Sequence, residues 1–265
     1  MAKISELLAF LTRAVVTGLA LAFLIVYFWP SLAGRLRAPE PEPAAAEHDE
    51  GWPGGRSNHY LFDMNRDWFL QSQCESRAKA AAYLHWQPQI YVDAHEMGHN
   101  ATYFFSPKAG PVNPFVLPHQ TESQELLGRQ LARRFDANGF AYTTGEMFDG
   151  FFPGYGSTWP TLQGGLGILW EQAGVRGLVI DRDDERQLRF HDAVRHHYVS
   201  ALATLEFAAS HARRLVEEFY ESRCRSIQLG REGPVRHYFL LAGKAPQRAA
   251  GLAELLRENG IEVQR

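Results

Sequence analysis

The stretch QPQIYVDAHEMGHN, residues 87–100, decides the fold that this sequence predicts. Gln87-Pro88 interrupts a helix-like segment, and a β-rich run at 89–94 follows directly after that break. The alternation continues along the chain, which has helical patterns at 75–86, 121–138, 191–224 and 247–258, a long loop at 95–119, and strand-like runs at 166–170, 177–180, 237–242 and 261–263. Strands that alternate with helices predict an α/β sandwich around a parallel or mixed sheet.

The same stretch contains His95, Glu96 and His99 in the spacing H-E-x-x-H. On a helix this spacing directs two imidazoles at one zinc ion and supplies a glutamate as base. Here the motif follows a β-rich run, contains Gly98, and leads into a segment without a helical repeat. We therefore expect His95 at the carboxyl end of a strand, where open α/β folds place their sites. A zincin-type endopeptidase that uses all three residues is the alternative.

Three further segments carry side chains suited to chemistry. Asn65-Arg66 in NRDW offers an amide beside a guanidinium, a pair that can hold a planar carboxylate. Glu171 follows an apolar run, where desolvation can raise its pKa towards that of a general base. Tyr155 stands between glycines in PGYGSTWP, an exposed setting for a phenol. Taken singly, each has an ordinary structural explanation: a surface pair, a helix cap and a packed loop aromatic.

Together these segments resemble the second half of the zinc carboxypeptidase family, the carboxypeptidase A-like metallopeptidases. The resemblance covers residues 54–209 and is carried by NHYLFDMNRDWF, YVDAHEMGHNATYFF, FFPGYGSTWP and GILWEQA. It implies a three-layer α/β/α sandwich with a mixed sheet. It also implies one Zn²⁺ ion and hydrolysis of C-terminal peptide bonds by zinc-activated water, with a peptide or protein C-terminus as substrate.

The resemblance also assigns a role to each matching residue. His95 becomes the third zinc ligand, and Asn65 with Arg66 binds the terminal carboxylate of the substrate. Tyr155 becomes a mobile tyrosine that contacts the substrate. Glu171 becomes the general base on zinc-bound water and then the proton donor to the leaving amine.

The family's other two zinc ligands are a His and a Glu three residues apart, upstream of the Asn-Arg pair. Residues 1–64 contain no H-x-x-E: neither His48 nor His59 has a glutamate three residues on. A catalytic zinc usually needs three protein ligands, so we expect this chain to bind zinc weakly and to have impaired activity. An inactive module in which Asn65 and Arg66 still hold a peptide carboxylate is a further hypothesis.

The chain divides by composition. Residues 14–32 carry no charge and are long enough to cross a bilayer, whereas the following segment is rich in Pro, Ala and Glu. We expect a single-pass membrane protein with its domain in the periplasm or outside the cell. Its N-terminal part is a membrane anchor at 1–35 (a transmembrane helix or signal anchor), followed by a linker at 36–55. A partial zinc carboxypeptidase-like domain at 56–230 and a βαβ-like extension at 231–265 complete the chain.

Net charge and cysteine content argue against nucleic-acid binding, a disulfide framework and a cysteine zinc site. The net charge of -3, with both signs interspersed, offers no basic surface for nucleic acid. Cys74 and Cys224 are too few for a disulfide framework and lack the spacing of a zinc site. They can form one bridge in an oxidising compartment or stay as buried free thiols.

Overall fold

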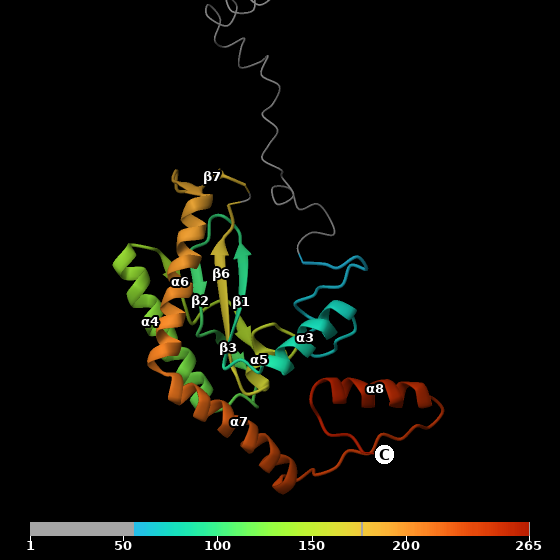
Figure 1. Ribbon diagram of the computed structural model, residues 1–265. Coiled ribbons are helices and arrows are strands. Elements are labelled where there is room, and N and C mark those ends of the chain that lie inside the picture. Colours follow the sequence, from blue (N-terminus) through green and yellow to red (C-terminus); the bar gives the residue numbers. More distant parts are fainter. Residues whose placement is uncertain (1–55, 176, 265) are drawn as a thin grey trace, which may run out of the picture. The chain divides into compact units, whose positions relative to one another are not determined.

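The structure is a computed structural model that describes residues 56–175 and 177–264 (Figure 1). The expected membrane anchor and linker, at 1–35 and 36–55, lie outside the described residues. Within the described ranges, no helix combines the length and the apolar character needed to cross a bilayer.

A four-stranded sheet forms the centre of the fold, in the order β1-β6-β2-β4. The long strands β1 (Ile90–Met97) and β6 (Leu166–Ala173) pair in parallel, while β2 (Tyr103–Phe105) runs antiparallel to β6 and parallel to β4 (Tyr142–Thr143). The prediction of an α/β fold with a mixed sheet is therefore confirmed. Strand β1 lies at one edge of this sheet.

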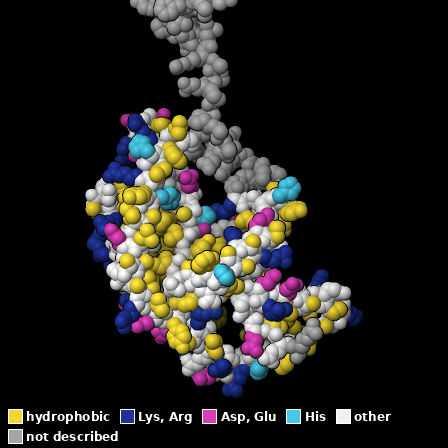
Figure 2. Space-filling view, in the orientation of Figure 1, with side chains coloured by type: hydrophobic (Ala, Val, Ile, Leu, Met, Phe, Trp, Pro, Cys, Tyr) yellow, Lys and Arg dark blue, Asp and Glu magenta, His cyan; other side chains and the backbone are white. Residues whose placement is uncertain are grey.

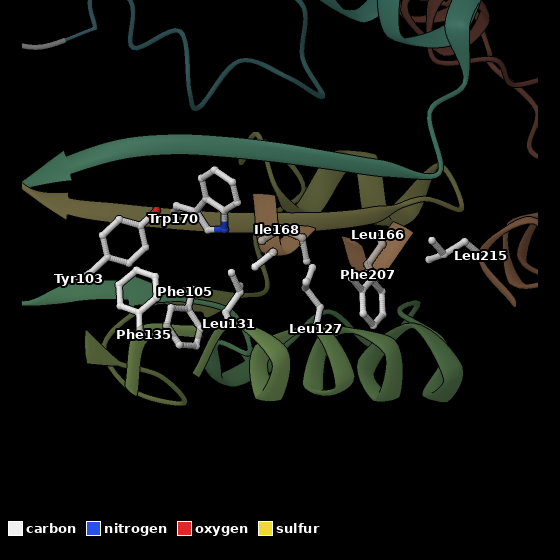
Figure 3. Packing of buried hydrophobic residues seen from close by; sticks show 11 residues of the cluster. Tyr103, Phe105, Leu127, Leu131, Phe135, Leu166, Ile168, Trp170, Phe207 and Leu215 are labelled. Carbon is white, nitrogen blue, oxygen red and sulfur yellow. The ribbon is translucent and has the colours of Figure 1, made fainter. Parts of the chain in front are cut away.

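Helices α4 (Pro118–Asn138) and α6 (Phe190–Ser210) cover one face of the sheet (Figure 1). Because side chains alternate along a strand, every second residue of β6 points to these helices. Figure 3 shows the resulting core of aromatic and branched side chains, which contains Tyr103, Phe105, Leu127, Leu131, Phe135, Leu166, Ile168, Trp170, Phe207 and Leu215. Burial of each such side chain stabilises the folded state by roughly 1.5–3 kcal/mol.

The opposite face of the sheet packs against α3 (Cys74–Trp86) and the short helix α5 (Thr158–Leu162). Its buried cluster consists of Trp68, Ala80, Tyr83 and Trp159, with Tyr91 of β1 packed against it. The rings of Trp68 and Tyr91 meet edge to face, with their centroids 5.4 Å apart. This second core fixes the loop that precedes α3 against the sheet.

The remaining elements lie outside the central sheet. Strands β3 (Ala109–Val112) and β5 (Asp149–Gly150) form a parallel pair, and β7 (Val179–Asp181) and β8 (Gln187–Arg189) form an antiparallel hairpin. Helix α7 (Ala212–Glu232) follows α6, and α8 (Pro246–Glu258) lies near the end of the chain.

Asn259, directly after α8, attaches this last helix to the second core. Its Oδ1 accepts hydrogen bonds from Trp159 Nε1 at 2.8 Å and from Gln71 Nε2 at 3.2 Å, and its Nδ2 donates to the carbonyl oxygen of Phe69 at 3.1 Å. Asn259 is buried, so its amide stabilises this contact in a setting where unpaired polar groups are costly.

Several predicted elements are corrected by the structure. The long loop expected at 95–119 contains β2 and β3, and β1 and β6 each run three residues beyond their predicted ends. The strand expected to be buried at 177–180 belongs to the exposed β7–β8 hairpin, where Leu178 is 62% exposed. The helix expected at 191–224 is two helices, α6 and α7, that meet at His211.

The C-terminal segment also differs from its prediction. Of the βαβ-like extension expected at 231–265, the structure contains only α8, and the described residues 237–242 and 261–263 form no strand. Both cysteines, Cys74 and Cys224, are free and exposed, so neither the disulfide nor the buried thiols are found.

Large apolar side chains are exposed along α6, where Figure 2 shows hydrophobic atoms gathered on the surface. They recur every three or four residues, which places them on one face of the helix. The residues are Phe190, Val194, Tyr198, Leu202 and Leu205.

Candidate functional site

The register between β1 and β6 places His95 directly beside Glu171. In a parallel pair, neighbouring residues in register project to the same face of the sheet, and a two-residue period puts Asp93 on that face as well. The face is the one that carries Tyr91, opposite the core side of β6 formed by Ile168 and Trp170. An imidazole and two carboxylates therefore lie on the same face of the sheet.

This surface forms one wall of a pocket of about 310 Å³. The pocket contains every residue that the sequence nominated for the zinc carboxypeptidase-like site, although they lie up to about a hundred residues apart in the chain. The residues that line it are Arg56, Asn65, Arg66, Asp93, His95, Glu96, Met97, Lys108, Met147, Phe148, Asp149, Tyr155, Ser157, Leu169 and Glu171.

Asn65 is a buried hub of hydrogen bonds at the base of this pocket. Its Nδ2 donates to Asp93 Oδ2 at 3.0 Å and lies 2.7 Å from His95 Nε2. Its Oδ1 accepts from Trp68 Nε1 at 3.1 Å and from the backbone N–H of Gly156 at 2.9 Å. The Asn65 amide thus joins the loop before α3, strand β1 and the loop before α5 through its oxygen and the N–H that donates to Asp93.

Gly156 is required at this junction by the close approach of its neighbours. A Cβ at this position would lie 2.5 Å from Asn65 Oδ1 and 2.6 Å from Asp93 Oδ2. Both distances are far below van der Waals contact. Only glycine fits here without moving the site.

Asp93 holds His95 in place, with 2.8 Å between Asp93 Oδ1 and His95 Nε2. Burial alone would raise the pKa of Asp93, but hydrogen bonds from His95 and Asn65 keep that pKa below its usual value. A carboxylate at Nε2 fixes the ring and leaves Nδ1 as the other nitrogen, which is the arrangement of a metal-ligating histidine and its supporting carboxylate. Asp93 was not among the predicted site residues, although its position two residues before His95 on a strand could have indicated a role.

Glu171 is 9% exposed and lies inside β6, not after it as predicted. Burial raises the pKa of its carboxyl to about 7, while the nearby charges of His95 and Arg56 partly oppose that rise. A carboxyl that titrates near neutral pH can both accept and return a proton, as a general acid–base catalyst must.

Arg66 and Tyr155 form the exposed side of the pocket. The guanidinium carbon of Arg66 lies 4.6 Å from the centre of the Tyr155 ring, and its Nη1 donates to the carbonyl oxygen of Asn65 at 3.0 Å. Tyr155 Oη donates to Asp149 Oδ2 at 3.4 Å. Because one backbone oxygen and one ring orient the guanidinium, most of its five donors remain for an anionic ligand.

The zincin alternative requires a helix that the structure does not contain. His95 and Glu96 lie on strand β1, so their side chains point to opposite faces of the sheet. His99 lies beyond the strand, where its Nε2 is 3.3 Å from the side-chain amide of Asn100, and it does not line the pocket. The helical alignment of His95 with His99 is therefore contradicted.

The described residues do not fit a complete zinc site. Among them, no three His, Cys, Asp or Glu side chains come together in a group that could hold a metal ion. His95 offers one suitable nitrogen, but the coordination set of a catalytic zinc needs three protein ligands.

Sequence reasoning missed Lys108, Ser157 and Asp149, which also line the pocket. Lys108 Nζ donates to Ser157 Oγ at 2.6 Å, and desolvation lowers the pKa of Lys108 to about 8. Lys108 lies between Pro107 and Pro111, just before β3. The sequence of this segment shows no periodic pattern. Only the tertiary fold brings it to this pocket.

Comparison of the chain with protein-family models, with curated proteins and with solved structures gives no match in any of the three.

Proposed function

We propose that this chain is a carboxypeptidase-type peptidase domain that binds the C-terminus of a peptide or protein in the 310 Å³ pocket. The observation that carries the proposal is the parallel register of β1 and β6, which sets His95 beside Glu171 in the pocket that Arg66 enters. For hydrolysis of a C-terminal peptide bond, His95 supplies a metal-binding nitrogen, Glu171 a general base and Arg66 a cation that binds the terminal carboxylate.

Arg66 is the residue for the terminal carboxylate of the substrate. Its planar guanidinium can donate two parallel hydrogen bonds to a carboxylate, and stacking on Tyr155 limits its motion. Asn65 serves chiefly to position this arginine and the Asp93–His95 pair, since its own amide already makes hydrogen bonds with Asp93, Trp68 and Gly156. This modifies the role that the family resemblance gives to Asn65.

Glu171 carries the proton transfers. In its ionised form the carboxylate accepts a proton from the water that attacks the scissile carbonyl carbon, and the resulting carboxylic acid returns that proton to the amine that leaves. A pKa of about 7 lets both forms occur near neutral pH. The three-layer zinc carboxypeptidase-like architecture belongs to the same proposal, supported by helices packed on both faces of the mixed sheet.

Zinc belongs to the proposal as the cofactor expected from the resemblance, with His95 as one ligand. Since the described residues group no further ligands there, we expect weak zinc binding and low activity for this chain by itself. The same observation favours a second candidate function, a module that binds peptide C-termini through Arg66 without hydrolysing them. Location in a membrane, with the domain outside the cytoplasm, remains part of the proposal for residues 1–35.

A combined measurement of metal content and turnover tests the proposal. The purified chain is given Zn²⁺ and a peptide with a free C-terminus, and the release of the terminal residue is followed by chromatography. Slow hydrolysis that Glu171→Gln abolishes, while peptide binding persists, supports the peptidase. Binding without hydrolysis at any zinc concentration supports the binding module, and no binding at all contradicts both.

A further inference from the structure

Lys108 and Ser157 form a polar pair in the pocket that the proposed catalysis does not use. Lys108 lies just before β3, and its Nζ donates to Ser157 Oγ over 2.6 Å. Ser157 is 3% exposed and precedes α5. The stem of Lys108 passes close to Gly150, where an added Cβ would lie 3.6 Å from Lys108 Cδ.

The Lys108 ammonium carries a charge without an ion-pair partner. The ion pairs among the described residues do not include Lys108, and Asp93 and Asp149 raise its pKa only as more distant charges. Desolvated charges in proteins are usually paired, because an unpaired one is costly. With one N–H bonded to Ser157, two donors of the ammonium remain for a ligand in the pocket.

Ser157 adds a third donor at the same place. Since its Oγ accepts the hydrogen bond from Lys108, the hydroxyl hydrogen of Ser157 is available to donate. An ammonium and a hydroxyl side by side match the two oxygens of a carboxylate, and charge-assisted hydrogen bonds of this kind are about twice as strong as neutral ones.

Asp149 acts on Lys108 only as a more distant charge, and both of its carboxylate oxygens accept hydrogen bonds from other groups. Its Oδ1 accepts from the backbone N–H of Phe151 at 2.9 Å, and its Oδ2 accepts from Tyr155 Oη at 3.4 Å. The Asp149 carboxylate is thus turned to partners of its own. The pocket therefore presents two separate cations with open donors, Arg66 and Lys108.

We propose that Lys108 and Ser157 bind the side-chain carboxylate of an acidic C-terminal residue, glutamate or aspartate, whose α-carboxylate is held by Arg66. The inference rests on the proposed function and names its substrate class. A pocket of about 310 Å³ is at the small end of ligand sites, which suits a single residue with two carboxylates.

The test compares two peptides that differ only in charge, acetyl-Ala-Ala-Glu and acetyl-Ala-Ala-Gln, by calorimetric binding to the full chain. We expect the Glu peptide to bind roughly tenfold to a hundredfold more tightly. Lys108→Met keeps the packed stem and should bring the ratio of the two dissociation constants close to one, and Ser157→Ala should lower it. Arg56→Met is the matched control, because Arg56 also lines the pocket but is already paired with Asp63 at 2.9 Å.

An equal or weaker affinity for the Glu peptide, or a Glu preference that survives Lys108→Met in a folded variant, overturns the inference. Circular dichroism of each variant establishes that it is folded. Hydrolysis of both peptides is measured separately, so absent turnover counts against the proposed peptidase, whereas the affinity ratio alone decides the acidic preference. Failure of both peptides to bind contradicts the two proposals together.

Discussion

Replacing Glu171 by glutamine should make the stability of the protein less sensitive to pH. Burial raises the pKa of Glu171 from 4.5 to about 7 in the folded state. Below pH 4.5 the carboxyl is protonated in both the folded and the unfolded chain and has no effect. Between these two pKa values the unfolded chain ionises and the folded protein does not, so the free energy of unfolding falls as the pH rises.

The size of this loss follows from the pKa difference. A shift of roughly 2.5 pKa units corresponds to about 3 kcal/mol, of which about 2.5 kcal/mol falls between pH 5 and pH 8. Glu171→Gln keeps the shape of the side chain and cannot ionise. Relative to the wild type, its free energy of unfolding should therefore increase by that amount over this pH interval.

Urea denaturation at pH 5 and pH 8, in the presence of a chelator, measures the difference. Groups that do not interact with Glu171 titrate alike in both proteins and cancel. Glu125→Gln is the control, because Glu125 is 48% exposed and its pair with Arg129 lies on the surface. A Glu171→Gln variant whose stability relative to the wild type is the same at both pH values would refute the reasoning about desolvation.

Three further substitutions test the packing of the site and the core. Gly156→Ala should destabilise the fold by about 1–3 kcal/mol, since its Cβ would lie 2.5 Å from Asn65 Oδ1, whereas Gly98→Ala has nothing within 4 Å and should be nearly neutral in the same urea titration. Asn65→Ala leaves buried donors unpaired, and thermal unfolding should show a loss of roughly 2–3 kcal/mol. Phe135→Ala removes a ring that is 0% exposed and should cost about 3–5 kcal/mol by urea denaturation, while Phe115→Ala, at 74% exposure, should change little.

The long elements could be predicted from the sequence because their patterns are strong and their ends are marked. Strand β1 follows Gln87, which adopts a left-handed conformation with φ of 46° and ends α3, and Gly139 ends α4 with φ of 66°. The short elements could not be predicted. Strands β2, β4 and β5 have two or three residues each, too few for a periodic pattern, and α5 is a five-residue helix that contains Pro160.

The candidate site could be predicted in its residue types but not in its architecture. His95 and Glu171 stand out as polar residues beside apolar runs, yet no pattern reveals that β1 and β6 pair in register across more than seventy residues. The engagement of the Asn65 amide and the burial of Lys108 depend on loops that meet only in the folded protein. Such tertiary contacts leave no periodic signal along the chain.

The central claim is that Arg66 makes this pocket a receptor for a terminal carboxylate. The most direct measurement is the affinity of the chain for acetyl-Ala-Ala-Glu compared with the same peptide amidated at its C-terminus. The free acid should bind at least about tenfold more tightly in the wild type, and Arg66→Met should remove that difference. Equal affinities for the acid and the amide in the wild type would contradict the account.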